Sequence, residues 1–76
     1  TRMTAGQQEV LDVLGTYGPL PDHALVPLAQ HVTKSHQSSS SIRSRRAELV
    51  RMGRVRDAGT DIIMPSGRRA TSWEVV

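Results

Sequence analysis

The sequence predicts a small α+β domain in which three helices are followed by a two-stranded β-hairpin. In three successive segments apolar residues recur at helical spacing, and Gly, Pro or serine-rich stretches separate these segments. The C-terminal segment changes to an alternation of apolar and polar residues, which is typical of a strand. The chain has 76 residues, enough for one small core, so we expect a single domain over residues 1–76.

The first helix is expected over about residues 5–17. Thr4 and Gln7 have the spacing of a capping box, in which each side chain accepts a hydrogen bond from the other residue's backbone N–H. The Gly-Pro pair at 18–19 ends the helix. Leu20 is then available for a short strand or an extended connection.

The second helix is expected over about residues 22–32, with Pro21 and Asp22 suited to its first turn. Pro27 is unfavourable inside a helix because it lacks an N–H donor and its ring crowds the preceding turn. We expect it to delay or kink the helix. The inner face is formed by apolar residues at helical spacing, namely Leu25, Leu28, Ala29 and Val32.

The third helix is expected over about residues 39–52. The serines at 38–41 offer several N-cap choices, although such a run can also be a flexible linker. With Ile42 at the centre of the buried face, Leu49 falls beside it. Gly53 can adopt the left-handed conformation that ends a helix.

The opposite face of this third helix is polar and basic. Arg46 is an exception, because its position falls on the inward side next to Ile42. We expect its stem to pack and its guanidinium to pair with Asp12 or Glu9 of the first helix. Arg45 lies on the flank. The outward set is Ser40, Arg43, Ser44, Ala47 and Arg51.

The hairpin strands are expected over about residues 54–58 and 70–76, joined by a long loop. Val55 should face inward and Arg56 outward. Trp73 belongs to the apolar half of the alternation, and we expect it to pack the sheet onto the first helix.

Three consecutive apolar residues, Ile62 to Met64, fall in the expected loop, which is ordinarily polar. Two interpretations stay open. Either the strands extend further and these residues fold back onto the sheet, or the residues form an apolar edge for a partner chain, such as a second copy.

Charge is distributed unevenly along the chain. Residues 1–38 contain two basic and three acidic side chains, a net charge of −1. Residues 39–76 contain eight arginines and four acidic side chains, a net charge of +4. A genome rich in G and C favours arginine codons, but it does not explain the clustering. The forked guanidinium of arginine binds phosphates and guanine edges through two hydrogen bonds. The cluster of arginines in the second half of the chain therefore predicts a polyanionic partner.

Several functions are not expected from this composition. The chain has no cysteine, which excludes disulfides, thiolate zinc sites and cysteine nucleophiles. The spacings of His23, His31 and His36 place no two of them on one helical face. No nucleophile-and-base set or glycine-rich phosphate loop is evident. We therefore expect no catalysis, no metal, no cofactor and no small-molecule ligand, and no apolar stretch is long enough to span a membrane.

Residues 41–57, Ser-Ile-Arg-Ser-Arg-Arg-Ala-Glu-Leu-Val-Arg-Met-Gly-Arg-Val-Arg-Asp, resemble the recognition helix, glycine and first wing strand of winged helix-turn-helix domains. Gly67-Arg-Arg-Ala and Trp73-Glu-Val resemble the returning wing strand, and residues 8–14 with Tyr17-Gly-Pro-Leu resemble the first helix and first short strand. The resemblance covers nearly the whole chain. It is strongest to small regulators and phage-encoded proteins of high-GC actinobacteria.

The resemblance implies how DNA would be bound. In this family the third helix usually enters the major groove, while the wing reaches a neighbouring minor groove or the phosphates. Arg43 would then make either a bidentate contact to guanine or a phosphate contact. Arg56 is either a phosphate contact or a strand charge facing Glu74. The groove-facing set would be Ser40, Arg43, Ser44, Ala47 and Arg51, with Arg68 and Arg69 in the wing either at the minor groove or on a solvated tip.

Together these observations predict a sequence-specific double-stranded DNA-binding protein of the bacterial cytoplasm or a phage-infected host. It would be a transcriptional regulator or a phage control protein, and a homodimer is left open. Two alternatives remain. One is a winged-helix protein–protein interaction module that uses Ile62 to Met64. The other is an architectural accessory factor in recombination, which would bend DNA.

Overall fold

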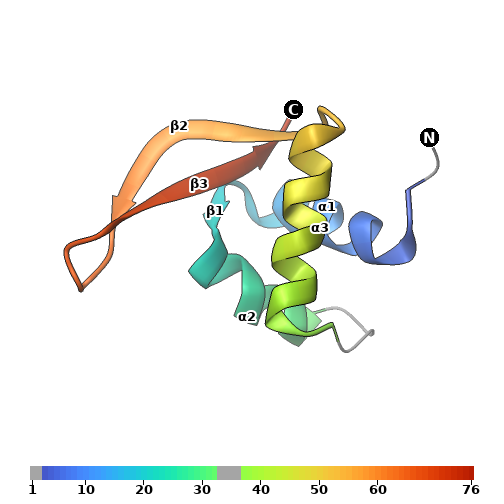
Figure 1. Cartoon of the computed structure of the whole chain (residues 1–76), viewed down its shortest axis with the longest axis horizontal. Coiled ribbons are helices and arrows are strands. Elements are labelled where there is room, and N and C mark those ends of the chain that lie inside the picture. The colour runs from blue at the N-terminus through green and yellow to red at the C-terminus, as the bar shows by residue number, and fades with distance from the viewer. Residues whose placement is uncertain (1–2, 33–36) are drawn as a thin grey trace.

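The computed structural model describes residues 3–32 and 37–76 of the chain. Its three helices lie together, and a long hairpin extends away from them (Figure 1). This is a small α+β domain with an antiparallel three-stranded sheet, and it is compatible with a winged-helix fold. The elements are, in order, α1 (Ala5–Tyr17), β1 (Leu20–Pro21), α2 (Asp22–Val32), α3 (Ser39–Arg51), β2 (Val55–Ile63) and β3 (Arg69–Val75).

The start of α1 confirms the expected capping box. The Gln7 N–H donates to the Thr4 Oγ1 at 3.2 Å, and the Thr4 N–H donates to the Gln7 Oε1 at 3.0 Å. These bonds satisfy two N–H groups that a helix start leaves without partners. At the other end Gly18 has a φ of +83°, and its N–H donates to the Leu14 carbonyl. The local sequence therefore determines both ends of this helix.

The α2 helix differs from the expectation in two ways. It begins at Asp22 and continues past Pro27, which lies on the exposed side, so the proline does not delay the helix. The inner face is also rotated, because Val26 is buried while Val32 is 40% exposed. Val32 lies in the last position of the helix and extends past the core.

The sheet has three strands in the order β1-β3-β2, because the short strand left open at Leu20 forms and joins the expected two-stranded hairpin. Leu20 pairs with Trp73 and Pro21 pairs with Ser72, so the short β1 covers one edge of β3. Only two residues make this third strand, and its partner lies some fifty residues away in the sequence. The alternation of apolar and polar residues in one segment does not reveal such pairing.

The hairpin is longer than expected because β2 continues to Ile63 instead of ending near residue 58. Val55 is paired with Val75 at the root, and Ile63 with Arg69 at the far end. The register shifts between residues 57 and 61, where β2 carries two more residues than β3. At this bulge Gly59 has a φ of +77°, and its N–H donates to the Asp57 Oδ1 at 2.8 Å. Asp and Gly favour turns, but here they form a bulge inside a strand.

The core lies between the three helices and the root of the sheet. Its largest fully buried apolar side chains come from α1, α2, α3 and β2, so every helix contributes at least one of them. No helix in the described ranges is long and apolar enough to cross a membrane. These largest fully buried apolar side chains are Val10, Leu14, Leu25, Ile42, Leu49 and Val55.

Candidate nucleic-acid interface

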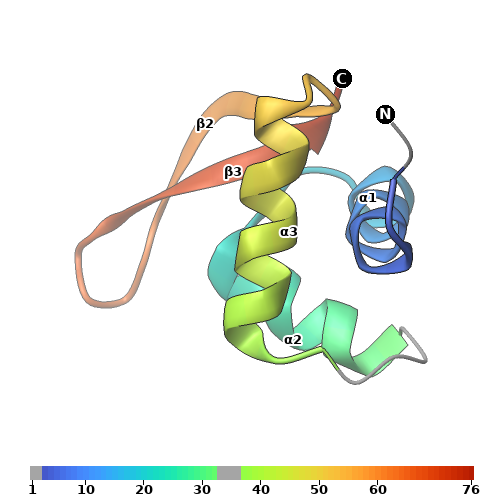
Figure 2. The same cartoon turned by 45° about the vertical axis from the view of Figure 1, so that its right-hand side comes forward.

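The α3 helix has one buried face and one exposed face, as the sequence predicts. Its N-cap Ser38 accepts a hydrogen bond from the Ser41 N–H at 3.2 Å, which fixes the helix start. Ile42 and Leu49 are fully buried. On the opposite side no other helix or strand of the described ranges covers α3 (Figure 2). Of the predicted outward set, Ser40, Arg43, Ser44 and Arg51 are exposed and Ala47 is partly exposed.

Arg46 holds α3 against α2 and the sheet. Its Nε donates to the Asp22 Oδ1 at 3.0 Å, and its Nη2 donates to Oδ2 at 2.8 Å. The guanidinium also lies over the Trp73 ring, 4.2 Å from the ring centroid. The expected pairing with Asp12 or Glu9 is therefore wrong. Because α2 begins beneath the inward side of α3, its first carboxylate reaches Arg46 before any acid of α1 does.

The other flank of α3 is joined to α1. Arg45 Nε lies 2.7 Å from the Glu48 Oε1, and Nη2 donates to the Glu48 Oε2 at 2.8 Å. The Gln7 amide of α1 donates to the same carboxylate at 2.8 Å. Hydrogen bonds from Gln7 and then Arg45 lower the pKa of the Glu48 carboxyl from its ordinary value. Arg45, which could have served either role, thus takes part in the contact between helices.

The arginines of the hairpin are neutralised to different degrees. Arg56 donates from Nε to the Glu74 Oε2 at 3.0 Å, so it faces Glu74 across the hairpin, and its phosphate contact stays a prediction. The Arg69 Nη1 lies 3.9 Å from the Asp61 Oδ2, between side chains that are 79% and 50% exposed. Such a pair is weak in water.

Four arginines in the described ranges make no ion pair, namely Arg43, Arg51, Arg54 and Arg68. Arg43 lies in the first half of α3 and Arg51 at its end, Arg54 comes three residues after α3, and Arg68 precedes β3. All four are exposed. Arg54 is absent from the predicted set. Arg54 lies one residue after Gly53, where the chain leaves the helix. This position could have identified its side chain as an exposed cation beside α3.

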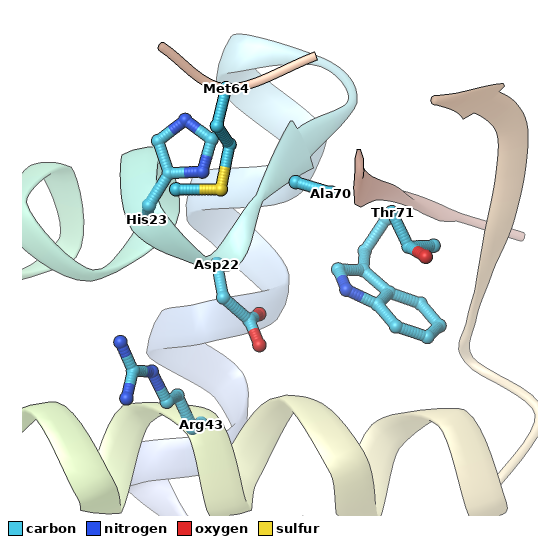
Figure 3. A pocket seen from close by; sticks show the side chains of 7 residues that line it. Asp22, His23, Arg43, Met64, Ala70 and Thr71 are labelled. Atoms are coloured by element: carbon cyan, nitrogen blue, oxygen red, sulfur yellow. The ribbon is translucent and has the colours of Figure 1, made fainter. Parts of the chain in front are cut away.

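An open groove of about 450 Å³ separates the N-terminal half of α3 from the hairpin. Figure 3 shows the side chains of His23, Met64, Asp22 and Arg43 among those that line the groove. The Asp22 carboxylate is already bound by Arg46, which leaves Arg43 as an unpaired cation facing the groove. The lining residues are Asp22, His23, Arg43, Met64, Ala70, Thr71 and Trp73.

Trp73 was expected to pack the sheet onto α1. In the structure its ring is stacked under Arg46 and borders the groove. Nearer the end of β3, Val75 lies against α1, because a Cβ added to Gly15 would be 3.8 Å from the Val75 Cγ2. Trp73 is half-buried and forms part of the wall of the groove on the hairpin side.

Over residues 3–32 and 37–76, no group of three or more His, Asp or Glu side chains could hold a metal ion. His36 lies outside the described residues. No protein-family model, curated protein or solved structure matches this chain. The exposed face of α3, the groove and the hairpin are therefore the features of this chain that point to a function.

Proposed function

We propose that this protein binds double-stranded DNA and acts as a transcriptional regulator or a phage control protein. In this proposal α3 enters the major groove, and the hairpin formed by β2 and β3 is a wing that reaches the adjacent minor groove or its phosphates. The observation that carries the proposal is the outward face of α3. It is uncovered along the whole helix, while Ile42 and Leu49 on the opposite face are fully buried.

The chemistry of this face suits base edges and phosphates. Arg43 and Arg51 provide two cations on this face, and Ser40 and Ser44 provide hydroxyl donors in its N-terminal half. The partly exposed Ala47 leaves room for a thymine methyl group. A helix about 10–12 Å wide with its side chains fits the major groove, which is about 12 Å wide.

The groove beside α3 gives a path for the DNA backbone in this proposal. A strand that passes from the major groove contact to the wing has to cross the space between α3 and the hairpin. Arg43 and His23 face that space from two different helices, and Arg68 lies on the hairpin beyond it. A phosphate chain would thus meet a cation at each end of the crossing.

The test is DNA binding by fluorescence anisotropy at low salt, on mixed genomic duplexes, followed by salt titration. We expect log affinity to fall linearly with log salt, with a slope of about −0.9 for each phosphate engaged. Ser44→Glu places a negative charge at the centre of the outward face and should abolish binding. Thr16→Glu makes the same kind of change on the exposed side of α1 and is the matched control.

Both variants should keep the thermal stability of the wild type, because both residues are exposed. Equal binding by wild type and Ser44→Glu would show that α3 does not face DNA. Absence of binding by the wild type at low salt would reject the proposal as a whole.

A second candidate is a winged-helix module that binds protein, and the exposure of Ile63 favours it. On this alternative the outward face of α3 would be a solvated surface, and Ser44→Glu would have no effect on any partner. Binding of mixed DNA at low salt separates the two candidates.

A further inference from the structure

The free end of the hairpin exposes large apolar side chains. Figures 1 and 2 show this end extending well beyond the helices. Ile63 is 72% exposed and Ile62 is 39% exposed, whereas Val55 at the root of the same strand is 2% exposed. The strand itself does not require isoleucine at this position, because a threonine would favour the same conformation without exposing as much apolar surface. We therefore expect the exposed isoleucine to contact a partner.

The tip presents one bulky apolar side chain beside two cations. Ile63 pairs with Arg69 across the hairpin, so the two side chains lie on the same face. Beyond them the chain turns, and the turn is closed by hydrogen bonds from the Met64 N–H to the Arg68 carbonyl and from the Gly67 N–H to the Met64 carbonyl, both at 2.8 Å. Arg68 is exposed on the returning side of this turn.

A second copy of the chain is one conceivable partner, because β2 is an edge strand with one side unpaired. The bulge between residues 57 and 61 argues against it, since bulges interrupt the straight edge that a second strand would need. Only residues 61–63 continue regularly beyond the bulge. Antiparallel pairing of two copies about Ile62 would place the Asp61 carboxylate opposite Ile63, which is unfavourable.

The DNA minor groove fits the same surface better. Arg68 and Arg69 complement its phosphates, and the Asp61 carboxylate near Arg69 is only weakly bound. The minor groove is about 6 Å wide, and the two backbones of a hairpin are already about 4.8 Å apart, so the tip enters only if the groove opens. Isoleucine cannot form hydrogen bonds with base edges, but it can insert between base pairs that separate.

We propose that Ile63 is a wedge that inserts between two base pairs from the minor groove and bends the DNA, while Arg68 and Arg69 hold the flanking phosphates. This inference rests on the proposed DNA binding and adds a deformation of the DNA to it. Opening of the groove costs least at flexible pyrimidine–purine steps. The wing would therefore select deformable sequence without reading base edges.

The experiment uses a duplex of about 20 base pairs with a central run of alternating T and A, which supplies flexible TpA steps. One adenine in the run is replaced by 2-aminopurine, whose fluorescence rises when it unstacks, and a donor–acceptor pair on the two ends reports bending. Wild-type protein should raise the 2-aminopurine fluorescence and shorten the end-to-end distance. Ile63→Ala should lose both signals and weaken binding about tenfold, as expected when an isoleucine loses most of its buried area.

Two variants control for size and for position. Ile63→Leu keeps a bulky apolar side chain and should keep both signals. Ile62→Ala makes the same truncation on the other face of the strand, next to Ala70, and should also keep them. Thermal melts confirm that all three variants fold, which their exposed positions favour.

Each other outcome overturns the wedge in a distinguishable way. Wild-type binding without unstacking, or an unchanged signal in Ile63→Ala, rejects the wedge and leaves DNA binding by α3 intact. Failure of the wild type to bind any duplex rejects both proposals. If sedimentation finds a dimer that Ile63→Ala dissociates while the DNA signals stay unchanged, the apolar tip is an interface between copies.

Discussion

Two arginines of α3, three positions apart, lie in very different surroundings. Arg46 has a side chain only 17% exposed, binds Asp22 through two hydrogen bonds and covers the Trp73 ring. Arg43 is exposed at the rim of the groove and makes no ion pair with any described residue. An arginine thus stabilises the packing of the fold on one side of the helix, while an arginine on the other side remains available for a ligand. Residue type alone does not identify a DNA contact.

The sharpest contrast between the two faces of α3 is expected from Leu49→Ala on the buried face. Leu49 is fully buried, and truncation of a buried leucine costs about 2–5 kcal/mol of stability through lost burial and the cavity left behind. Urea denaturation measures this loss. Ser44→Ala on the exposed face is the control and should change stability by less than about 0.5 kcal/mol. Similar losses from both would show that the helix is oriented differently.

Arg46→Ala should be the next largest change. It leaves the Asp22 carboxylate without its partner and uncovers Trp73, so we expect a loss of about 2 kcal/mol. This is less than for a fully buried pair, because both side chains keep some exposure. In the double variant Arg46→Ala/Asp22→Asn part of the stability should return, since no unpaired charge remains. A loss no larger than that of Arg43→Ala would contradict the assigned role.

Arg43→Ala should show the reverse pattern. Stability should stay within about 0.5 kcal/mol of the wild type, because the side chain is exposed. Affinity for a DNA site selected from random duplexes should fall by about 1–3 kcal/mol, as for a bidentate contact to guanine. Binding assays on the selected and on scrambled duplexes make the comparison. Equal losses on both would assign Arg43 to a phosphate instead.

Arg69→Ala should weaken binding to all duplexes by a similar, smaller factor. We expect the salt dependence of log affinity to lose about 0.9 of its slope, the contribution of one phosphate contact. Asp61→Asn should have the opposite effect, because it removes the carboxylate 3.9 Å from the Arg69 guanidinium. Salt titrations of the two variants test whether affinity falls in Arg69→Ala and rises in Asp61→Asn. If Asp61→Asn leaves affinity unchanged, the tip does not approach the phosphates.

The smallest expected effect concerns pH and the junction of α3 with α1. Gln7 and Arg45 lower the pKa of Glu48 in the folded state, so ionised Glu48 stabilises the fold at neutral pH. That contribution is lost as the pH falls below the ordinary carboxyl range and through the lowered pKa of the folded state. Glu48→Gln should therefore be less stable than the wild type at neutral pH, and the difference should vanish in acid. Urea denaturation across this pH range measures it.

Much of the helical part could be predicted because the signals are local. The capping box of Thr4 and Gln7, the cap at Ser38 and the left-handed Gly53 involve residues close in sequence. The two faces of α3 follow from helical periodicity, so the sequence could also predict that its outward set is exposed. The hairpin was harder, since Asp57 and Gly59 have the composition of a turn and lie within a bulged strand.

The sequence by itself determined where the helices begin and end and which side of α3 faces the core, because hydrogen bonds and side chains within a few residues of one another decide both. Only the tertiary structure decided that β1 is a third strand, that Arg46 binds Asp22, and that Arg56 faces Glu74. These partners are 18 to 53 residues apart in sequence, and several acids could have served equally well by spacing alone. Packing of the helices selects among them by bringing one carboxylate within reach and leaving the others too far away.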